Sequence, residues 1–194
     1  MLTVTTGSIV IDNIDLATLP HDKVREQLVT ISQTPFVMVG CTVRFNVDPT
    51  ESLPDTGIIA ALDRVGLWGG VLLERGGLDA EINDTLSLSR GEQQLLQLAR
   101  AMLKIQATNA KILLIDEGTS SVDVKTDARV QDLLQQDPFR TCTVLTVAHR
   151  VHTLLTCDLV VGLDRGKVVE MDEPMVLRNR KDSIFSSLLN GGRN

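Results

Sequence analysis

The stretch ILLIDEGTSSVD, residues 112–123, restricts the possible folds most, because its apolar run ends abruptly in two adjacent acids. Asp116 and Glu117 follow four uninterrupted aliphatic residues, and such a run is typical of a strand covered on both faces of a sheet. Open α/β sheets place ligands at the carboxyl ends of their strands. Two interpretations stay open for the acids: a magnesium site, or a strand that simply ends at the surface.

The neighbouring segments alternate between strand and helix patterns. Residues 28–32 indicate a short strand ending at Gln33, and residues 143–148 form a second unalternated apolar run. Helical patterns cover residues 92–105 and 124–136. The apolar face of the first helix consists of Leu95, Leu98, Ala99, Met102 and Leu103. Strands that alternate with helices predict an α/β sheet with parallel pairing.

The two ends of the chain carry simpler patterns. Residues 7–16 alternate apolar and polar, which predicts a half-buried strand, and residues 45–57 are rich in turn formers. Residues 159–172 predict a hairpin that turns at Asp164–Lys167. A final helix is expected from Pro174, because proline favours the first helical position.

The composition excludes several classes of protein. A hydrophobic content of 43% in 194 residues suffices for the core of one domain, and a net charge of −6 argues against nucleic-acid binding. Cys41, Cys142 and Cys157 are odd in number and widely spaced, so no disulfide framework is expected. No apolar stretch reaches the about 20 residues that span a bilayer, and the first residues lack a signal-peptide pattern.

The stretch LSRGEQQLLQLARAML, residues 88–103, begins with a potential anion site. Ser89 and Glu92 have the spacing of a capping box at a helix start, where exposed N–H groups and the helix dipole favour negative ligands. Gly91 lowers helix propensity there and leaves room for another group to approach the backbone. A plain capped helix is the alternative interpretation.

Two further polar residues follow predicted strands. His149 lies just beyond the apolar run that ends at residue 148, where an imidazole could bond a phosphate oxygen, and Gln33 follows the strand of residues 28–32. Taken singly, each has an ordinary explanation, a structural histidine and a solvated loop glutamine.

The order and spacing of these stretches closely resemble the nucleotide-binding cassette of ABC transporters. Gln33 matches that family's Q-loop, residues 88–103 its signature motif, residues 112–123 its Walker B motif and D-loop, and His149 its switch histidine. The stretch PFVMVGCTVRFNVDP, residues 35–49, is similar to the C-terminal cassette of the multidrug-resistance-associated exporters. The resemblance implies an α/β, P-loop NTPase-like cassette with a parallel-rich sheet and an inserted helical subdomain at about residues 41–105.

The resemblance also implies a role for each matching residue towards ATP and Mg²⁺. Asp116 would coordinate Mg²⁺, and Glu117 would be the general base for the attacking water. His149 would contact the γ-phosphate, while Gln33 would sense Mg²⁺ and relay its state to the membrane domains. Asp123 would lie at the interface between two cassettes.

In the same family, cassettes pair head to tail. Ser89 and Gly91 would therefore bind the γ-phosphate of ATP held by the opposing cassette. Glu92 stands where the family usually has glutamine, and its charge would weaken that binding. The expected partners are a second cassette and the transmembrane domains of a transporter, at the cytoplasmic face of a membrane, without direct insertion of this chain and without nucleic acid.

One family motif is missing from the 194 residues. The phosphate loop has the form G-x-x-x-x-G-K-[ST], but the only Gly-Lys pair, Gly166–Lys167, is followed by Val168 and preceded five positions earlier by Val161. We therefore expect residues 1–194 to be a cassette truncated at its N-terminus. Without the loop we expect no significant ATPase activity from this chain alone, and we expect exposed sheet edges and apolar surface.

Two alternatives differ in class from the catalytic part of an exporter. A non-catalytic regulatory partner would offer Ser89 and Gly91 to ATP bound on another cassette, although such a protein would have no need of Glu117 and His149. A chromosome-maintenance or DNA-repair ATPase shares the signature and Walker B motifs, but the chain has no long coiled-coil heptads and is acidic.

Overall fold

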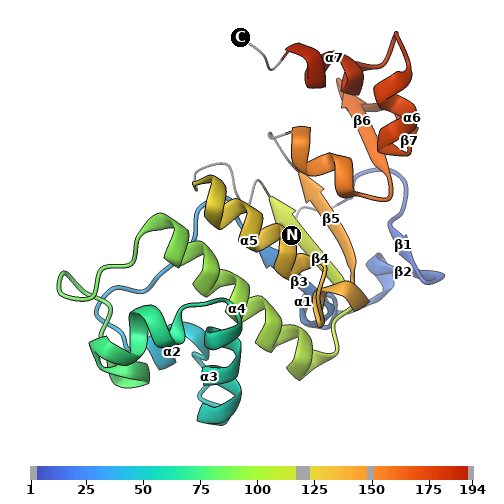
Figure 1. Ribbon diagram of the computed structural model, residues 1–194. Helices are drawn as coiled ribbons and strands as arrows, with labels where there is room; N and C mark the ends of the chain where they lie inside the picture. Colours follow the sequence, from blue (N-terminus) through green and yellow to red (C-terminus); the bar gives the residue numbers. More distant parts are fainter. Residues whose placement is uncertain (1–3, 117–122, 148–150, 192–194) are drawn as a thin grey trace. The chain divides into compact units, whose positions relative to one another are not determined.

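The structure, a computed structural model, describes residues 4–116, 123–147 and 151–191. Its chain divides into two units, residues 1–146 and residues 147–194, and Figure 1 traces the elements of both. Each unit has buried apolar side chains of its own, so the two are described separately.

A three-stranded sheet forms the centre of the first unit, in the order β3 (Leu28–Ile31), β4 (Ile112–Asp116) and β5 (Thr143–Val147). β3 and β4 pair in parallel, with Leu28 opposite Ile112 and Ile31 opposite Ile115. All three strands coincide with predicted apolar segments. The predicted α/β fold with parallel pairing is confirmed.

Helices make up most of the rest of the first unit. They are α1 (His21–Gln27), α2 (Val43–Val47), α3 (Asp55–Arg64), α4 (Arg90–Thr108) and α5 (Val124–Leu134), with short helical turns at Leu16–Thr18, Trp68–Leu72, Leu73–Arg75, Gly77–Asp79 and Phe139–Thr141. Among the described residues no single helix is long and apolar enough to cross a membrane. α3 and the helical residues Trp68–Arg75 are together long and apolar enough, but the chain bends by 98° between them.

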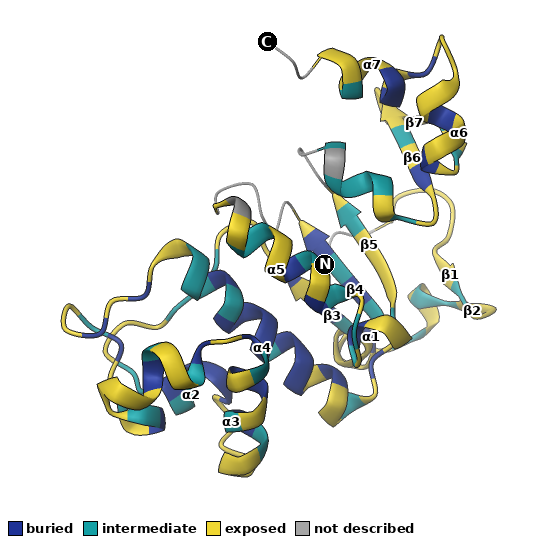
Figure 2. Cartoon of the chain, in the orientation of Figure 1, coloured by how far each residue is buried: buried dark blue, intermediate teal, exposed yellow. Residues whose placement is uncertain are grey.

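The long helix α4 lies at the centre of the packing. It contacts α2, α3, α5 and β3, and Figure 2 shows it as buried along most of its length. The helix is longer than the predicted residues 92–105, because a capping box precedes it and Asn109, in a left-handed conformation, follows it. Four predicted face residues are buried and Leu95 is half-buried. Leu96 and Ile105 are buried as well, so α4 is covered on more than one side.

The N-terminal segment differs from the prediction. Residues 7–16 do not form one half-buried strand but a small antiparallel hairpin of β1 (Val10–Ile11) and β2 (Ile14–Asp15). The two residues between these strands, Asp12 and Asn13, both have positive φ, as the tight hairpin turn requires. The side chains of Val10 and Ile14 are about half exposed, so the alternating pattern did not indicate burial here.

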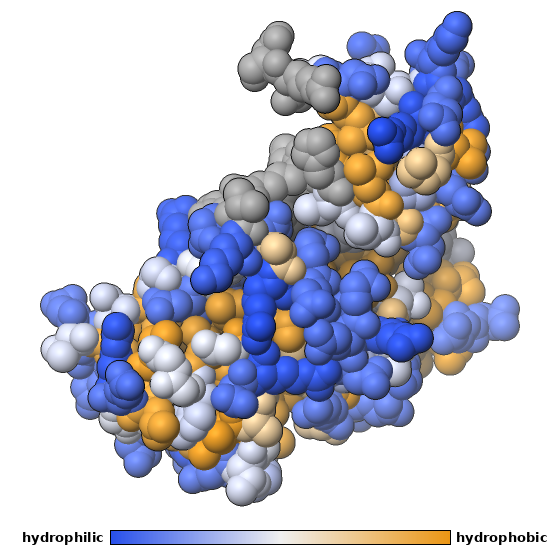
Figure 3. Space-filling view, in the orientation of Figure 1, coloured by the Kyte–Doolittle hydropathy of each residue, from blue (hydrophilic) through white to orange (hydrophobic). Residues whose placement is uncertain are grey.

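Strand β5 is also less buried than its sequence predicts. Val144, Leu145 and Val147 are 37%, 58% and 62% exposed, so the predicted cover on both faces is wrong for this strand in the described part of the chain. The main helix contacts of the sheet, those of α1 and α4, fall on β3 at the other edge. The apolar surface expected at the sheet is therefore present on β5. Figure 3 shows that apolar residues also reach the molecular surface in other parts of the chain.

The second unit is built on the predicted hairpin. β6 (Val160–Asp164) and β7 (Lys167–Asp172) pair antiparallel, and the turn residues Arg165 and Gly166 both have positive φ. The hairpin is followed by helices, which are α6 (Pro174–Asn179) and α7 (Ile184–Gly191), and it is preceded by the short helix η6 (Val151–Thr156). Both the hairpin turn and a helix starting at Pro174 are confirmed.

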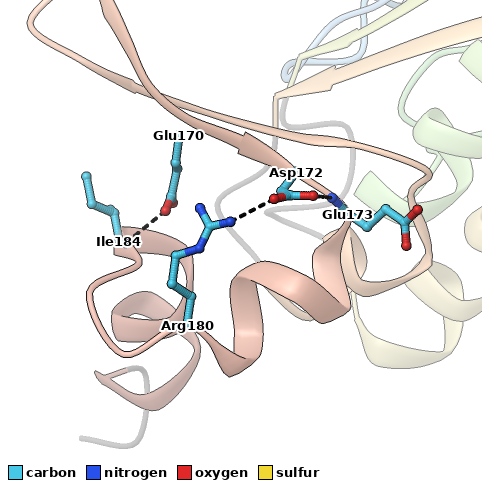
Figure 4. Close-up of polar contacts among 5 residues, drawn as sticks. All are labelled: Glu170, Asp172, Glu173, Arg180 and Ile184. Carbon is cyan, nitrogen blue, oxygen red and sulfur yellow. Dashed lines mark hydrogen bonds and ion pairs between the residues drawn. The ribbon is translucent and has the colours of Figure 1, made fainter.

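Acidic side chains of β7 fix the two C-terminal helices (Figure 4). The Glu170 carboxylate accepts hydrogen bonds from the backbone N–H groups of Ile184 and Phe185 at the start of α7, at 3.2 and 2.8 Å. Asp172 accepts a hydrogen bond from the Arg180 guanidinium at 2.7 Å. These contacts tie the end of α6 and the start of α7 to the hairpin.

Two predictions on chain organisation remain. The three cysteines are free thiols, each half-buried. The helical subdomain at about residues 41–105 stays a prediction, although α2, α3 and most of α4 fall within those limits.

Candidate functional site

The parallel strands β3 and β4 bring two predicted site residues to the same edge of the sheet. Ile31 pairs with Ile115, so the chain leaves both strands at neighbouring positions. Asp116 is the last residue of β4 and is exposed, and Gln33 follows β3 by two residues and is also exposed. A carboxylate and a side-chain amide thus follow adjacent strand ends, where ligands of open α/β sheets bind.

Two other predicted residues, Glu117 and His149, lie outside the described residues. Their roles therefore rest on sequence alone. Glu117 directly follows Asp116, and His149 stands two residues beyond the end of β5.

The start of α4 is a complete capping box. The Ser89 hydroxyl accepts a hydrogen bond from the Glu92 N–H at 3.3 Å, and the Glu92 carboxylate accepts one from the Ser89 N–H at 2.7 Å. Ser89 is exposed and Glu92 half-buried. The predicted box is confirmed, and Glu92, the residue that departs from the family pattern, has a local structural function.

Gly91 faces the beginning of α5. A Cβ atom added to Gly91 would lie 3.1 Å from Thr126 Oγ1, 3.4 Å from Thr126 Cγ2 and 3.6 Å from Asp123 Oδ2. Contacts of 3.0–3.4 Å are tighter than most side chains accept. The group for which Gly91 leaves room is therefore a side chain of the same unit, Thr126.

Asp123 is the N-cap of α5. One carboxylate oxygen accepts hydrogen bonds from the N–H groups of Lys125 and Thr126, each at 3.0 Å, and the other accepts from the Thr126 hydroxyl at 2.8 Å. The Thr126 hydroxyl and backbone hydrogen bonds lower the pKa of Asp123 below its ordinary value, so it is anionic at neutral pH. Asp123 and Thr126 thus join the start of α5 to that of α4.

The Asp116 carboxylate at the sheet edge could supply only some of the oxygen ligands of a magnesium ion. No group of three or more His, Cys, Asp or Glu side chains suited to a metal ion occurs among the described residues. Mg²⁺ is commonly held by one or two carboxylates together with nucleotide phosphates and water. The exposed carboxylate of Asp116 meets that requirement only where a nucleotide supplies the remaining oxygens.

Sequence reasoning missed a set of polar residues close to these motifs. Thr126 packs against Gly91, while Asn46, Gln97 and Arg100 hydrogen-bond around the chain that follows β3. Gln97 and Arg100 stand three residues apart on α4, and Gln97 is 9% exposed. Polar residues within an otherwise apolar helix were the available signal, since buried polar groups need partners.

The chain resembles known transporters along nearly its whole length. The family profile described as ABC transporter matches residues 1–120. The chain is 44% identical over 184 residues to ATP-binding cassette sub-family C member 10 of Mus musculus, and 41% identical over 188 residues to ABC multidrug transporter B of Aspergillus fumigatus. It is also 41% identical over 184 residues to human ATP-binding cassette sub-family C member 8.

These alignments cover 94%, 97% and 94% of this chain, but only 12%, 12% and 11% of the relatives. The chain therefore spans about an eighth of the length of these relatives. The profile match covers more than half of the 194 residues. The chain belongs to the ABC transporter family.

Proposed function

We propose that this chain is part of the ATP-binding and ATP-hydrolysing domain of an ABC transporter that exports organic solutes. The observation that carries the proposal is the parallel pairing of β3 with β4, which places Gln33 and Asp116 after neighbouring strand ends. The names of two relatives, a multidrug transporter and a member of sub-family C, support an exporter.

The proposed roles at the sheet edge follow the family motifs. Asp116 holds Mg²⁺, which neutralises developing charge on the phosphates when bound. Glu117 accepts the proton of the attacking water, and His149 donates a hydrogen bond to the γ-phosphate. Gln33 senses the occupied site and transmits its state to the transmembrane domains at the cytoplasmic face of the membrane.

The proposed role of the α4 start is to act on a second cassette. Ser89 is exposed at the N-terminus of a 19-residue helix, whose dipole favours an anion. We assign Ser89 and Gly91 to the γ-phosphate of ATP held by the opposing, head-to-tail cassette, with the Glu92 side chain beside that site as the cap of the helix. Asp123 belongs to the same interface, next to Gly91.

A second candidate is a regulatory partner that binds another cassette without hydrolysing ATP itself. Two observations favour it: the capping box at the start of α4 is complete, and the 194 residues contain no phosphate loop. In both candidates the start of α4 recognises ATP on a partner, and they differ only in whether Asp116 and Glu117 take part in hydrolysis.

The shared feature can be tested by pairing. We expect the chain to bind the intact ATP-binding cassette that includes the aligned region of mouse ATP-binding cassette sub-family C member 10, in the presence of Mg-ATP and not in its absence. Replacing Ser89→Arg should weaken this binding by at least about tenfold, because it removes a hydrogen bond to a charged phosphate and fills the site. Sedimentation velocity with labelled chain measures the dissociation constant.

The matched control for this experiment is Ser87→Arg. Ser87 is exposed two residues earlier, so the same charge and volume are added outside the capping box. Ser89→Thr preserves the cap and should pair normally. If Ser89→Arg pairs as well as Ser87→Arg, the start of α4 is not the ATP-facing surface.

Glu92 allows a prediction in which stability and binding change in opposite directions. Glu92→Gln retains an oxygen that accepts from the Ser89 N–H but removes a negative charge from the helix start. We expect the free energy of unfolding to fall by about 0.3–1 kcal/mol, the usual gain from a carboxylate near a helix N-terminus. ATP-dependent pairing should strengthen by about twofold to fivefold, since the same charge repels phosphate.

Urea unfolding and the pairing assay measure the two changes for Glu92→Gln. Glu74→Gln, at an exposed position of the same unit, controls for the loss of one charge elsewhere. Unchanged or weaker pairing of Glu92→Gln would show that its charge does not face the nucleotide.

A further inference from the structure

Three polar side chains of α4 point at the chain on either side of Gln33. Gln97, Arg100 and Lys104 are spaced at i, i+3 and i+7, so they lie along one side of the helix. Lys104 donates hydrogen bonds to the backbone oxygens of Arg25 and Leu28, at 3.1 and 2.9 Å. These bonds fix the beginning of β3, whereas Gln97 and Arg100 reach the chain beyond its end.

Gln97 fixes the residue directly before Gln33. Its side-chain amide lies 2.9 Å from the Ser32 hydroxyl. With the amide oxygen and nitrogen exchanged, the oxygen accepts from the Ser32 hydroxyl at 2.9 Å and from the Ser32 N–H at 2.7 Å, and the nitrogen donates to the Ser32 oxygen at 3.3 Å. The exchanged orientation satisfies both ends of the amide, so we adopt it.

Arg100 and Asn46 fix the residues after Gln33. Arg100 donates to the backbone oxygens of Phe36 and Asn46, and to Asn46 Oδ1 at 3.1 Å. Asn46 is 2% exposed, and its side chain accepts from the Met38 N–H at 2.7 Å and donates to the Met38 oxygen at 2.9 Å. Burial lowers the pKa of Arg100, yet the guanidinium stays charged at neutral pH.

The segment of residues 32–38, here called the Gln33 segment, is therefore held by α4 at Ser32 and at Phe36. Its last residue, Met38, is held by Asn46 of α2, which Arg100 contacts in turn. Breaking either contact leaves polar groups of a half-buried network without partners, which costs more than the bond itself contributes. Because α4 begins at the capping box of Ser89 and Glu92, the helix that carries the signature motif also sets the position of Gln33.

We propose that Gln97 and Arg100 are positioning residues for Gln33, whose two-ended attachment to α4 couples Gln33 to the helix start that faces the opposing ATP. The inference rests on the proposed function for the roles of Gln33 and Ser89. The attachment itself is a property of this chain without nucleotide.

Amide hydrogen exchange of the 194-residue chain, followed by NMR without nucleotide, tests the attachment at two sites. The Ser32 N–H reports on Gln97, and the Met38 N–H reports on the Arg100 and Asn46 pair. We expect Ser32 to exchange roughly threefold to tenfold faster in Gln97→Met, the change for one hydrogen bond. In Arg100→Met, Met38 should exchange roughly threefold to tenfold faster, because Arg100 holds the Asn46 Oδ1 that accepts from the Met38 N–H.

Lys104→Met provides the matched control. It removes a cation from the same side of α4 but leaves the contacts to Ser32 and Met38 intact, so both amides should keep their wild-type exchange. The Leu113 amide in the core of β4 reports global opening, so its acceleration in each variant measures the loss of global stability. Faster exchange of Ser32 in Gln97→Met and of Met38 in Arg100→Met, without such acceleration in Lys104→Met, supports positioning, while equal acceleration of both amides in Lys104→Met overturns it.

Conservative variants still test the inference if Gln97→Met or Arg100→Met does not fold. Gln97→Glu retains an acceptor for the Ser32 N–H but loses the donor to the Ser32 oxygen, so Ser32 should keep part of its protection. Arg100→Lys supplies one amine in place of the guanidinium fork, so Met38 should exchange at an intermediate rate. Loss of protection in Gln97→Glu equal to that in Gln97→Met would also overturn the inference.

Pairing with the intact mouse cassette separates this inference from the proposed function. If the wild-type chain does not pair in Mg-ATP, the proposed function fails, and the exchange experiment still decides whether α4 holds the Gln33 segment. If the chain pairs, Gln97→Met and Arg100→Met should weaken pairing more than Lys104→Met does.

Discussion

A chain of these 194 residues should release no phosphate from Mg-ATP at steady state above the level of its Glu117→Gln variant. Phosphoryl transfer depends mainly on positioning and charge stabilisation, and no G-x-x-x-x-G-K-[ST] sequence is present to supply them from this chain. A general base contributes about 10²–10⁴-fold in rate, which does not replace an absent phosphate cradle. Removing even one preorganised donor costs about 10²–10³-fold in related sites.

A coupled phosphate-release assay measures this activity, with the intact mouse cassette as a positive control. The chain alone should show no release. Steady release that Glu117→Gln abolishes would contradict the prediction. It would mean that Asp116 and Glu117 hydrolyse a nucleotide held by some other part of these residues.

The elements that sequence patterns predicted well are those whose partners are local. The capping box of Ser89 and Glu92 needs only three residues of spacing, and the turn at Arg165–Gly166 needs only two residues that accept positive φ. The strand ends at Gln33 and Asp116 were also predictable. Apolar runs mark the strands, and parallel pairing then brings their carboxyl ends to one edge.

Apart from the local hairpin of β1 and β2, the features that were missed depend on distant contacts. An apolar run shows that a strand can be buried, but the exposure of Leu145 depends on which helices cover β5. Similarly, nothing near Gly91 in the sequence indicates that Thr126 packs against it, 35 residues later. The contact of Gln97 with Ser32 joins residues 65 positions apart. Sequence periodicity predicts which side of a helix is apolar, but only the three-dimensional structure shows which residues pack against that side.

The start of α4 is the point where these distant contacts meet. Its first turn carries the residues that we propose as the signature motif, and it packs against Thr126 of α5. The helix then continues into the side that holds the Gln33 segment. A ligand that bound Ser89 would therefore act on a helix already joined to both neighbours.

Gly91→Val should lower the free energy of unfolding by about 1–3 kcal/mol, the usual cost of overpacking a tight contact. The new Cβ would lie 3.1 and 3.4 Å from two atoms of Thr126, and valine branches at that position. Helix propensity alone predicts the opposite sign, because glycine is the poorer helix former. Urea unfolding followed by circular dichroism measures the change in the free energy of unfolding. Its sign shows whether crowding against Thr126 or the gain in helix propensity is larger.

A control within the same unit and a second substitution isolate the contact. Gly57 occupies the first turn of α3, and a Cβ there would meet only Pro54 Cγ at 3.9 Å, so Gly57→Val should be neutral or slightly stabilising. Thr126→Ala removes both opposing atoms and should restore most of the stability lost in Gly91→Val, with a coupling above about 0.5 kcal/mol. Additive effects of the two substitutions would show that Thr126 does not confine Gly91, and the link between α4 and α5 would then have to lie elsewhere.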